Sequence, residues 1–229
     1  MNVLAVGAHA FETLFLTGGT LARYAADGHA VALAILCAPP PESLALGETA
    51  LARENETLRA ASLIGATVHH LRLDAASLSA GDGAAQSLLA DVIRKTTPRV
   101  ILTHDPLDHF PEYVLASELV FRCRSMHGRR TGATAPVDPP EVIYMDTLSG
   151  LGFEPEQFVD VTDVFATKRE MIACCGHEAD EWPNNPRLSW LDWLTVQSRY
   201  RGIQGGVGYA EAFRRPAAWG NMSPARLLP

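Results

Sequence analysis

The sequence from residue 6 to residue 37 reads VGAHAFETLFLTGGTLARYAADGHAVALAILC. Two apolar runs frame it, NVLAV at residues 2–6 and AVALAILC at residues 30–37. Each run has the length and composition of a buried strand. A Gly-rich turn is expected after the first run, followed by a helix over TLARYAADGH that stops at Gly28. This strand–helix–strand order predicts the beginning of an α/β fold.

The same alternation continues along the chain. The later strand-like segments are VHHLRLD, RVILTH, EVIYMD and QFVDVT. The later helix-like segments are ETALARENETLRAASLIGA, AAQSLLADVIRKTTP, EYVLASELVFRCRSM and DVFATKREMIACCG. We therefore predict a single domain over residues 1–229, with a Rossmann-like, mainly parallel sheet and helices on both faces. The Pro/Gly-rich residues 128–140 are expected to form a lid or an oligomer contact.

Composition excludes several classes of protein. The chain has 229 residues, of which 47% are hydrophobic and 20% charged, as in an ordinary globular protein. No apolar run is long enough to span a membrane, and no signal peptide precedes the first strand, so a cytoplasmic location is expected. The net charge of −7 argues against nucleic acid as a partner. The four cysteines form no C-x-x-C pair and are expected to be thiols.

Polar residues follow two of the predicted strands. His9 comes directly after the first strand, and THDPLDHFPEY, residues 103–113, spans the end of the fourth. Ligands of parallel α/β sheets bind outside the carboxyl ends of the strands, so both positions are candidates for a site. Carboxylates would be expected after His9, but Ala10 and Phe11 follow it.

With these strings in view, the chain resembles the LmbE-like, or PIG-L, deacetylase family nearly from end to end. The resemblance is carried by the opening VGAH…TGGTLARYAADGH and by ARENETLRAASLIGA, VILTHDPLDHFPEY, VIYMDT, FVDVTDVFATKREMIAC, RGIQGGVGYAEAFR and RLLP. Members are zinc-dependent hydrolases that remove acyl groups from N-acylated sugars and related small molecules. The resemblance implies the fold of these enzymes and a zinc-binding pocket.

The first family motif is altered here. The family reads A-H-P-D-D-E, in which the histidine and second aspartate bind zinc and the first aspartate is the general base. Residues 8–13 read A-H-A-F-E-T. His9 is therefore retained, Phe11 stands at the position of the base, and Glu12 stands at the position of the ligand aspartate.

The second motif is altered as well. A family subgroup reads T-H-x-P-x-D-Y-H-P-D-H where this chain has residues 103–113. Aligning the proline places Phe110 at the catalytic histidine and Tyr113 at the last zinc ligand. A one-residue gap would instead place His109 and Glu112 at these two positions. We prefer the ungapped alignment because both flanking strings then match.

The resemblance also implies residues that contact the substrate. Arg53 and Asp74 match positions that hold hydroxyls or charged groups of a substrate, and Cys175 replaces a family histidine. The expected substrate-binding residues are Phe11, Arg53, Asp74, His104, Phe110 and Cys175. His177 follows a predicted helix stop and is expected to lie in the pocket.

Two aromatic side chains at former catalytic positions would make the pocket floor more apolar. Such a floor is expected to raise the pKa values of nearby carboxylates, so that Glu12 and Glu112 can act as an acid/base pair. The predicted catalytic residues are Glu12, His109, Glu112 and His177. If a metal binds, its ligands would be His9, Glu12 and Tyr113, a donor set with a phenolate that suits Fe(III) better than Zn(II).

Three functions follow. The first is a small-molecule enzyme with a rebuilt, zinc-free site, performing C–N bond hydrolysis or another step of a specialised pathway. The second is a metal-dependent N-deacylase with substitute ligands, using zinc or another divalent metal. The third is a non-catalytic binding or partner subunit. The expected partner is a small molecule rather than nucleic acid or a membrane, and a homo-oligomer is expected because members of the family commonly assemble.

Overall fold

A seven-stranded sheet connects the residues that the computed structural model describes, which are 1–37, 47–75, 79–124, 139–176 and 189–217. The strands are β1 (Asn2–Gly7), β2 (Ala30–Cys37), β3 (Thr67–Leu73), β4 (Val100–Thr103), β5 (Glu141–Met145), β6 (Gln157–Asp160) and β7 (Ala210–Arg214). Their spatial order is β3-β2-β1-β4-β5-β7-β6. The first five strands pair in parallel, whereas β7 is antiparallel to β5 and β6. The predicted mainly parallel α/β sheet is confirmed.

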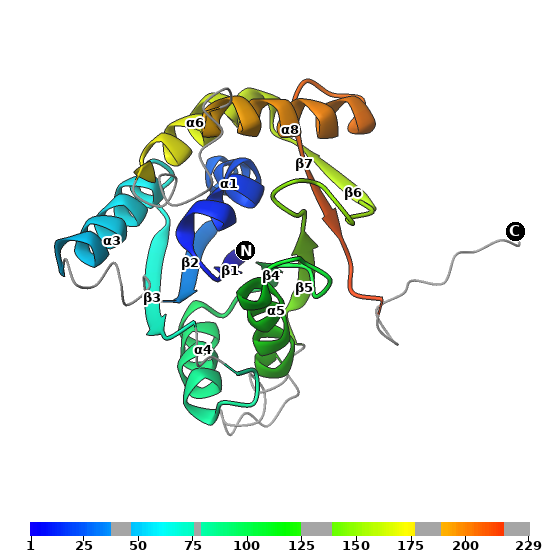
Figure 1. Cartoon of the computed structure of the whole chain (residues 1–229). Helices are drawn as coiled ribbons and strands as arrows, with labels where there is room; N and C mark the ends of the chain where they lie inside the picture. Colours follow the sequence, from blue (N-terminus) through cyan, green and yellow to red (C-terminus); the bar gives the residue numbers. More distant parts are fainter. Residues whose placement is uncertain (38–46, 76–78, 125–138, 177–188, 218–229) are drawn as a thin grey trace, which may run out of the picture.

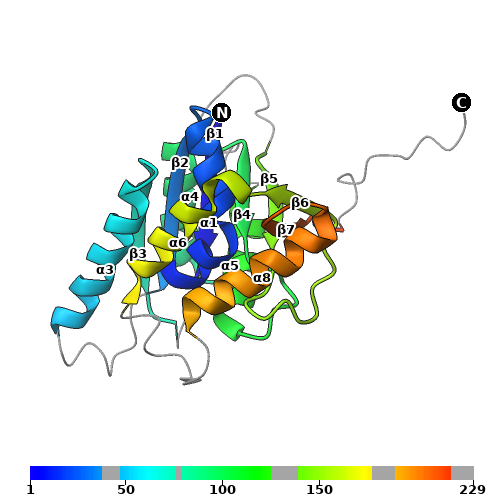
Figure 2. The same cartoon turned by 90° about the horizontal axis from the view of Figure 1, so that it is seen from above.

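Helices cover both faces of this sheet (Figure 1). They are α1 (Ala10–Ala26), α3 (Gly47–Ser62), α4 (Gly83–Thr96), α5 (Pro111–Arg124), α6 (Phe165–Ala173) and α8 (Trp190–Gly205), with the 3₁₀ turn η1 (Thr162–Val164) before α6. Figure 1 shows α4 and α5 on one side and α1, α3, α6 and α8 on the other, and Figure 2 shows α6 lying over α1. No helix among the described residues is long and apolar enough to cross a bilayer.

The central strand β1 shows why its sequence is a continuous apolar run. Val3, Leu4, Ala5 and Val6 are all buried, with at most 1% of their surface exposed. A strand covered by helices on both faces buries every side chain, so apolar residues do not alternate with polar ones. The edge strand β3 is only half-buried over most of its length and accommodates two histidines.

Helix α1 begins eight residues before Gly18, so the Gly-rich turn expected before a helix over TLARYAADGH is wrong. Gly18 and Gly19 lie inside the helix. A side chain on Gly19 would place its Cβ 2.7 Å from Val161, so this glycine permits close packing. The backbone N–H groups of Gly19 and Thr20 donate to the buried carboxylate of Glu211 on β7, which anchors the helix to the sheet.

Two C-terminal elements, α8 and β7, are absent from the predicted strands and helices. The buried side of α8 includes Ser198 and Arg201, so its sequence lacks a clear apolar stripe. The guanidinium of Arg201 donates two hydrogen bonds, of 2.6 and 2.8 Å, to the carboxylate of Asp146 just after β5. Most of the loop predicted at 128–140 lies outside the described residues, and its role stays a prediction.

Candidate active site

The carboxyl ends of β1, β2 and β4, which are neighbours in the sheet, carry the candidate active site. His9 follows β1 and caps α1, Cys37 ends β2, and His104 follows β4. This is the edge at which parallel α/β sheets bind ligands. The sheet therefore brings together residues that lie almost 100 positions apart in the sequence, such as Ala8 and His104, which are separated by 96 positions.

Glu12 is buried at the beginning of α1, with 1% of its surface exposed. Its carboxylate accepts the backbone N–H of His9 at 2.5 Å, and Oε1 lies 3.6 Å from Nε2 of His104. Burial alone raises the pKa of Glu12, but contact with His104 and the charges of His9 and His104 lower it below its ordinary value. The raised pKa expected for Glu12 is therefore wrong, because two imidazoles and a helix N-terminus stabilise the anion.

His104 is fully buried and is held on two sides. Its Nε2 accepts the backbone N–H of Ala8 at 3.1 Å, and its ring stacks on Tyr113 with the ring centroids 4.2 Å apart. Its Nδ1 has no hydrogen-bond partner among the described residues. Because Nε2 serves as an acceptor, the neutral ring carries its proton on Nδ1.

Asp108 lies four residues further along the same loop and has 9% of its surface exposed. Its Oδ1 accepts the backbone N–H of His109 at 2.6 Å and that of Phe110 at 3.3 Å. Its Oδ2 is buried and has no hydrogen-bond partner within the described part of the chain. Burial raises the pKa of Asp108 above its ordinary value, although the charge of His104 and the two backbone hydrogen bonds oppose this shift.

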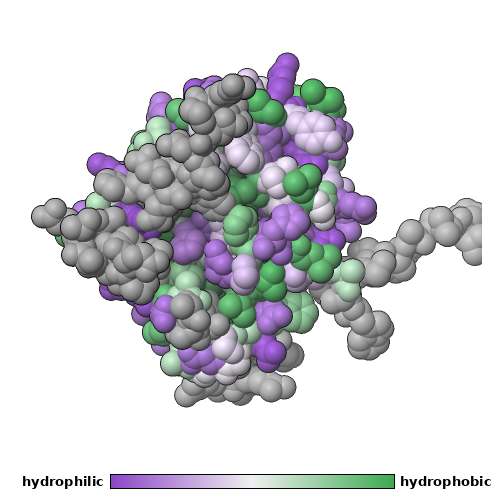
Figure 3. Space-filling model, viewed as in Figure 1, coloured by the Kyte–Doolittle hydropathy of each residue, from purple (hydrophilic) through white to green (hydrophobic). Residues whose placement is uncertain are grey.

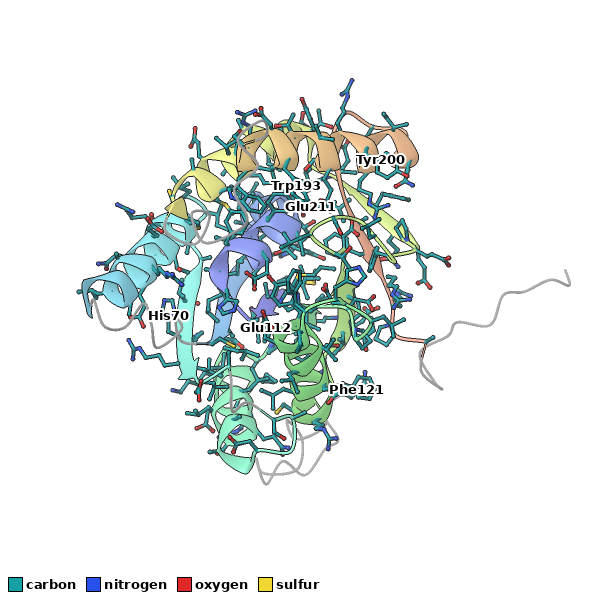
Figure 4. The ribbon with its side chains drawn as sticks, viewed as in Figure 1. His70, Glu112, Phe121, Trp193, Tyr200 and Glu211 are labelled. Atoms are coloured by element: carbon teal, nitrogen blue, oxygen red, sulfur yellow. The ribbon has the colours of Figure 1, made fainter. Side chains whose placement is uncertain are left out.

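Cys37 at the end of β2 lies close to three carboxylates. Burial, followed by the charges of Glu12, Glu112 and Asp74, raises the pKa of its thiol to about 12. This thiol is therefore protonated at neutral pH and is a poor nucleophile. Glu112 is half-buried at the beginning of α5, near the centre of the view in Figure 4. Glu12 and Glu112 thus both lie near the end of β2, and their role as an acid/base pair stays a prediction.

The two phenylalanines at former catalytic positions have different neighbours. Phe11 is 1% exposed and packs edge-on against Trp190 of α8, with the ring centroids 4.9 Å apart. Phe110 is half-buried, and its ring centroid lies 4.9 Å from that of Tyr113. Phe110 therefore adds an apolar wall next to the stacking partner of His104, whereas Phe11 packs in the hydrophobic core, and a contact between the two rings stays a prediction.

The remaining predicted residues occupy different surroundings. Arg53 on α3 and Cys175 after α6 are buried, with 6% and 1% of their surface exposed. Asp74 and His109 are exposed at loops. His177 lies outside the described residues. The substrate-binding and catalytic roles assigned to these five residues stay predictions.

With this geometry established, comparison with known proteins identifies the family. The family model of the GlcNAc-PI de-N-acetylase, PIG-L, matches residues 4–123, which is more than half of the chain. The chain belongs to the PIG-L family. The match covers β1 to α5 and so includes both altered motifs.

Relatives with named activities within this family catalyse more than one reaction. The 4-oxalmesaconate hydratase of Pseudomonas putida is 26% identical over 219 residues, covering 89% of this chain and 80% of the hydratase. The diacetylchitobiose deacetylase of Thermococcus kodakarensis is 25% identical over 229 residues, covering 93% and 82%. The crystal structure of the P. putida 4-carboxy-2-hydroxymuconate hydratase matches with a TM-score of 0.79 at 22% identity, covering 98% of this chain and 100% of that one. The fold is thus that of a PIG-L enzyme scaffold related to deacetylases and a hydratase.

Membership of the PIG-L family implies a zinc ion at positions that this chain fills with His9, Glu12 and Tyr113. Among the residues that the structure describes, no three His, Cys, Asp or Glu side chains gather closely enough to hold a metal. The carboxylate of Glu12 already accepts the N–H of His9, and Tyr113 is stacked on His104. A single histidine, an engaged carboxylate and a stacked phenol do not make the set of three histidine and carboxylate ligands typical of catalytic zinc, and we derive no step through a metal.

Sequence reasoning missed Asp108 as a functional residue and gave His104 only a substrate-binding role. A signal for Asp108 was present, because it aligns with the aspartate of the family string T-H-x-P-x-D. The contact between His104 and Glu12 could not be inferred, because it depends on β1 and β4 pairing side by side.

Proposed function

We propose that this chain is a small-molecule enzyme that activates water with His104 and Asp108, without a resident metal. The PIG-L scaffold supports this proposal, because its relatives include a hydratase and deacetylases. Hydration of a double bond and hydrolysis of an N-acyl group both require a base that deprotonates water and a donor that stabilises negative charge on oxygen.

One observation carries the proposal: Nδ1 of His104 and Oδ2 of Asp108 are buried without partners among the described residues. Leaving a buried polar atom unpaired costs about 1–3 kcal/mol. Native proteins keep few such atoms, and those at strand ends of an enzyme scaffold are candidates for chemistry. A donor and an acceptor left unpaired in one short loop suit a substrate or a water molecule that binds both.

The residues would then have the following roles in the reaction. Asp108, whose pKa is raised, takes a proton from water, and the resulting hydroxide attacks the substrate. The Nδ1–H of His104 donates to the oxygen on which negative charge develops. Asp108 finally returns its proton to the departing nitrogen in hydrolysis, or to carbon in hydration.

The test uses chelator-treated, dialysed protein and two substrates. Hydration of 4-oxalmesaconate is followed by the loss of its conjugated absorbance, and hydrolysis of diacetylchitobiose by the release of acetate. We expect turnover of one of them to survive chelation. His104→Gln and Asp108→Asn should each lower kcat/KM by about 100-fold. His29 comes just before β2, at the end of that strand away from the site, and provides a matched control, since His29→Gln should leave kcat/KM nearly unchanged.

Two outcomes would contradict the proposal. Turnover that requires added zinc, and that Glu12→Gln and Tyr113→Phe abolish while Asp108→Asn does not, would indicate a metal-dependent deacylase with substitute ligands. Binding of either compound without turnover, unaffected by the His104 and Asp108 variants, would indicate a non-catalytic subunit. The pH profile offers a further check, because loss of Asp108 should remove the rise in rate that accompanies its ionisation.

A further inference from the structure

A cavity lies beside α5, next to the loop that carries His104 and Asp108. Its volume is about 630 Å³, which is within the range of roughly 300–1,000 Å³ typical of small-molecule sites. It is formed by the loop after β4, one side of α5, Tyr144 of β5 and the end of β7. Phe121, labelled on α5 in Figure 4, marks its position.

The body of this cavity is apolar. Leu107 and Phe121 line it with 69% and 38% of their surfaces exposed, so the cavity presents two large apolar side chains to solvent. Tyr144, Pro106 and Pro216 complete the apolar lining. In Figure 3 the surface over α5 and the end of β7 carries hydrophobic and hydrophilic residues side by side. A ligand with an apolar body would cover these side chains.

The charged groups of the lining are mainly cationic. Arg122, Arg214 and Arg215 line the cavity, against Glu118 as the only carboxylate of the lining that the structure describes. Arg214 is fixed in place, because its guanidinium donates two hydrogen bonds to Asp105. Guanidinium groups pair well with carboxylate and sulfonate groups because they are planar and present several donors.

Arg215 and Arg122 are the two arginines that a ligand can reach most easily. Arg215 pairs at 3.1 Å with Glu141, but its side chain is 44% exposed and that of Glu141 is 47% exposed. Arg122 lies on the exposed side of α5. Exposed ion pairs are weak, so an incoming anion can compete with Glu141 for Arg215.

We propose that this cavity binds a small organic anion with an aromatic or branched apolar body, such as an aryl carboxylate or sulfonate. The apolar lining takes the body of the ligand, and Arg122 and Arg215 take its charge. The cavity shares the site loop but its lining includes neither His104 nor Asp108, and the proposal does not depend on the proposed function.

The test is a fluorescence titration of the full chain with 8-anilinonaphthalene-1-sulfonate. Its neutral counterpart is N-phenyl-1-naphthylamine, which has the same apolar body without the sulfonate. The double variant Arg122→Gln/Arg215→Gln should weaken sulfonate binding by about tenfold and leave binding of the neutral probe unchanged. Leu107→Ser should weaken the binding of both probes. Arg94→Gln, at a surface arginine of α4 away from the cavity, is the matched control and should change neither.

Three results would overturn this proposal. They are the absence of saturable sulfonate binding by the natural chain, binding that the double arginine variant leaves unchanged, and equal loss of both probes in that variant. Sedimentation velocity tests whether a second copy of this chain occupies the cavity instead. If Leu107→Ser dissociates an oligomer, the face is a contact between copies and the proposal fails. Circular dichroism confirms that each variant is folded, and both mutated arginines are surface residues whose loss spares the core.

Discussion

Two buried polar clusters in this protein differ in whether their polar atoms have hydrogen-bond partners. In the Glu211 cluster, both carboxylate oxygens of Glu211 are engaged by the N–H groups of Gly19 and Thr20 at 2.8 and 2.7 Å, and Lys168 pairs with the carboxylate at 2.8 Å. In the site loop, residues 103–108, Nδ1 of His104 and Oδ2 of Asp108 have no partner among the described residues.

This difference distinguishes residues that stabilise the fold from residues that are available for catalysis. The Glu211 cluster joins α1, α6 and β7, and its two charged groups, on Glu211 and Lys168, are paired. A fully paired charge has no capacity left for a ligand, so the cluster serves the fold. In the site loop, a donor and an acceptor remain available for a ligand. Their lack of partners lowers stability, which is common at functional sites. Substitutions in the two clusters should therefore change stability in opposite directions.

The largest expected effect is on stability, in the Glu211 cluster. Glu211→Gln leaves the ammonium group of Lys168 buried without its counter-charge, and should lower the free energy of unfolding by about 3–5 kcal/mol. Urea denaturation followed by circular dichroism measures this change. The double variant Lys168→Met/Glu211→Gln removes the orphaned charge and should recover much of the loss. Equal destabilisation by the single and double variants would show that the pair is not the source of the effect.

A smaller, pH-dependent effect is expected at Glu12, which connects the site to α1. Its pKa is lowered in the folded state, so its contribution is complete above the unfolded pKa and is lost as pH falls through the folded pKa. Glu12→Gln should therefore destabilise the protein by about 2 kcal/mol at pH 7. The difference from the natural chain should shrink as pH falls below 4.5, the ordinary pKa of this side chain. A difference independent of pH would mean that the charge of Glu12 has no role.

The smallest expected effect has the opposite sign and lies in the site loop. Burial raises the pKa of Asp108, so ionisation disfavours the folded state once pH exceeds the unfolded pKa. Asp108→Asn should therefore raise the free energy of unfolding by about 1 kcal/mol at pH 8, with no gain at pH 3, where both states are protonated. Thermal unfolding at the two pH values measures it, with Asp82→Asn at an exposed helix cap as the control for aspartate substitution. If Asp108→Asn instead lowers the free energy of unfolding at pH 8, Asp108 stabilises the fold, as Glu211 does.

The same contrast explains how much of the molecule could be predicted from sequence. The strands β1, β2, β4 and β5 were predicted because each is a short apolar run in a parallel sheet. The C-terminal α8 was not, because it buries Arg201 and Ser198 instead of an apolar stripe. Gly18 and Gly19 predicted a turn, and only the packing of Glu211 and Val161 shows why glycines are needed in the helix.

The candidate site was predicted in position but only partly in composition. His9 and residues 103–113 were correctly placed at strand ends, where the structure has them. The direction of the pKa shift of Glu12 could not be predicted, because it depends on the distance of its carboxylate from His104, which comes from another strand. The alignment with the family aspartate pointed to Asp108, but its unpaired oxygen becomes visible only when the whole surrounding structure is known.

The most direct measurement of the central claim is the protonation of His104 in chelator-treated protein, observed by NMR of ¹⁵N-labelled histidine and assigned with His104→Gln. The account predicts that the neutral ring carries its proton on Nδ1, because Nε2 accepts the N–H of Ala8. Asp108→Asn should then shift the Nδ1 resonance without changing the tautomer. A proton on Nε2, or a tautomer that changes only when zinc is added, would contradict the account.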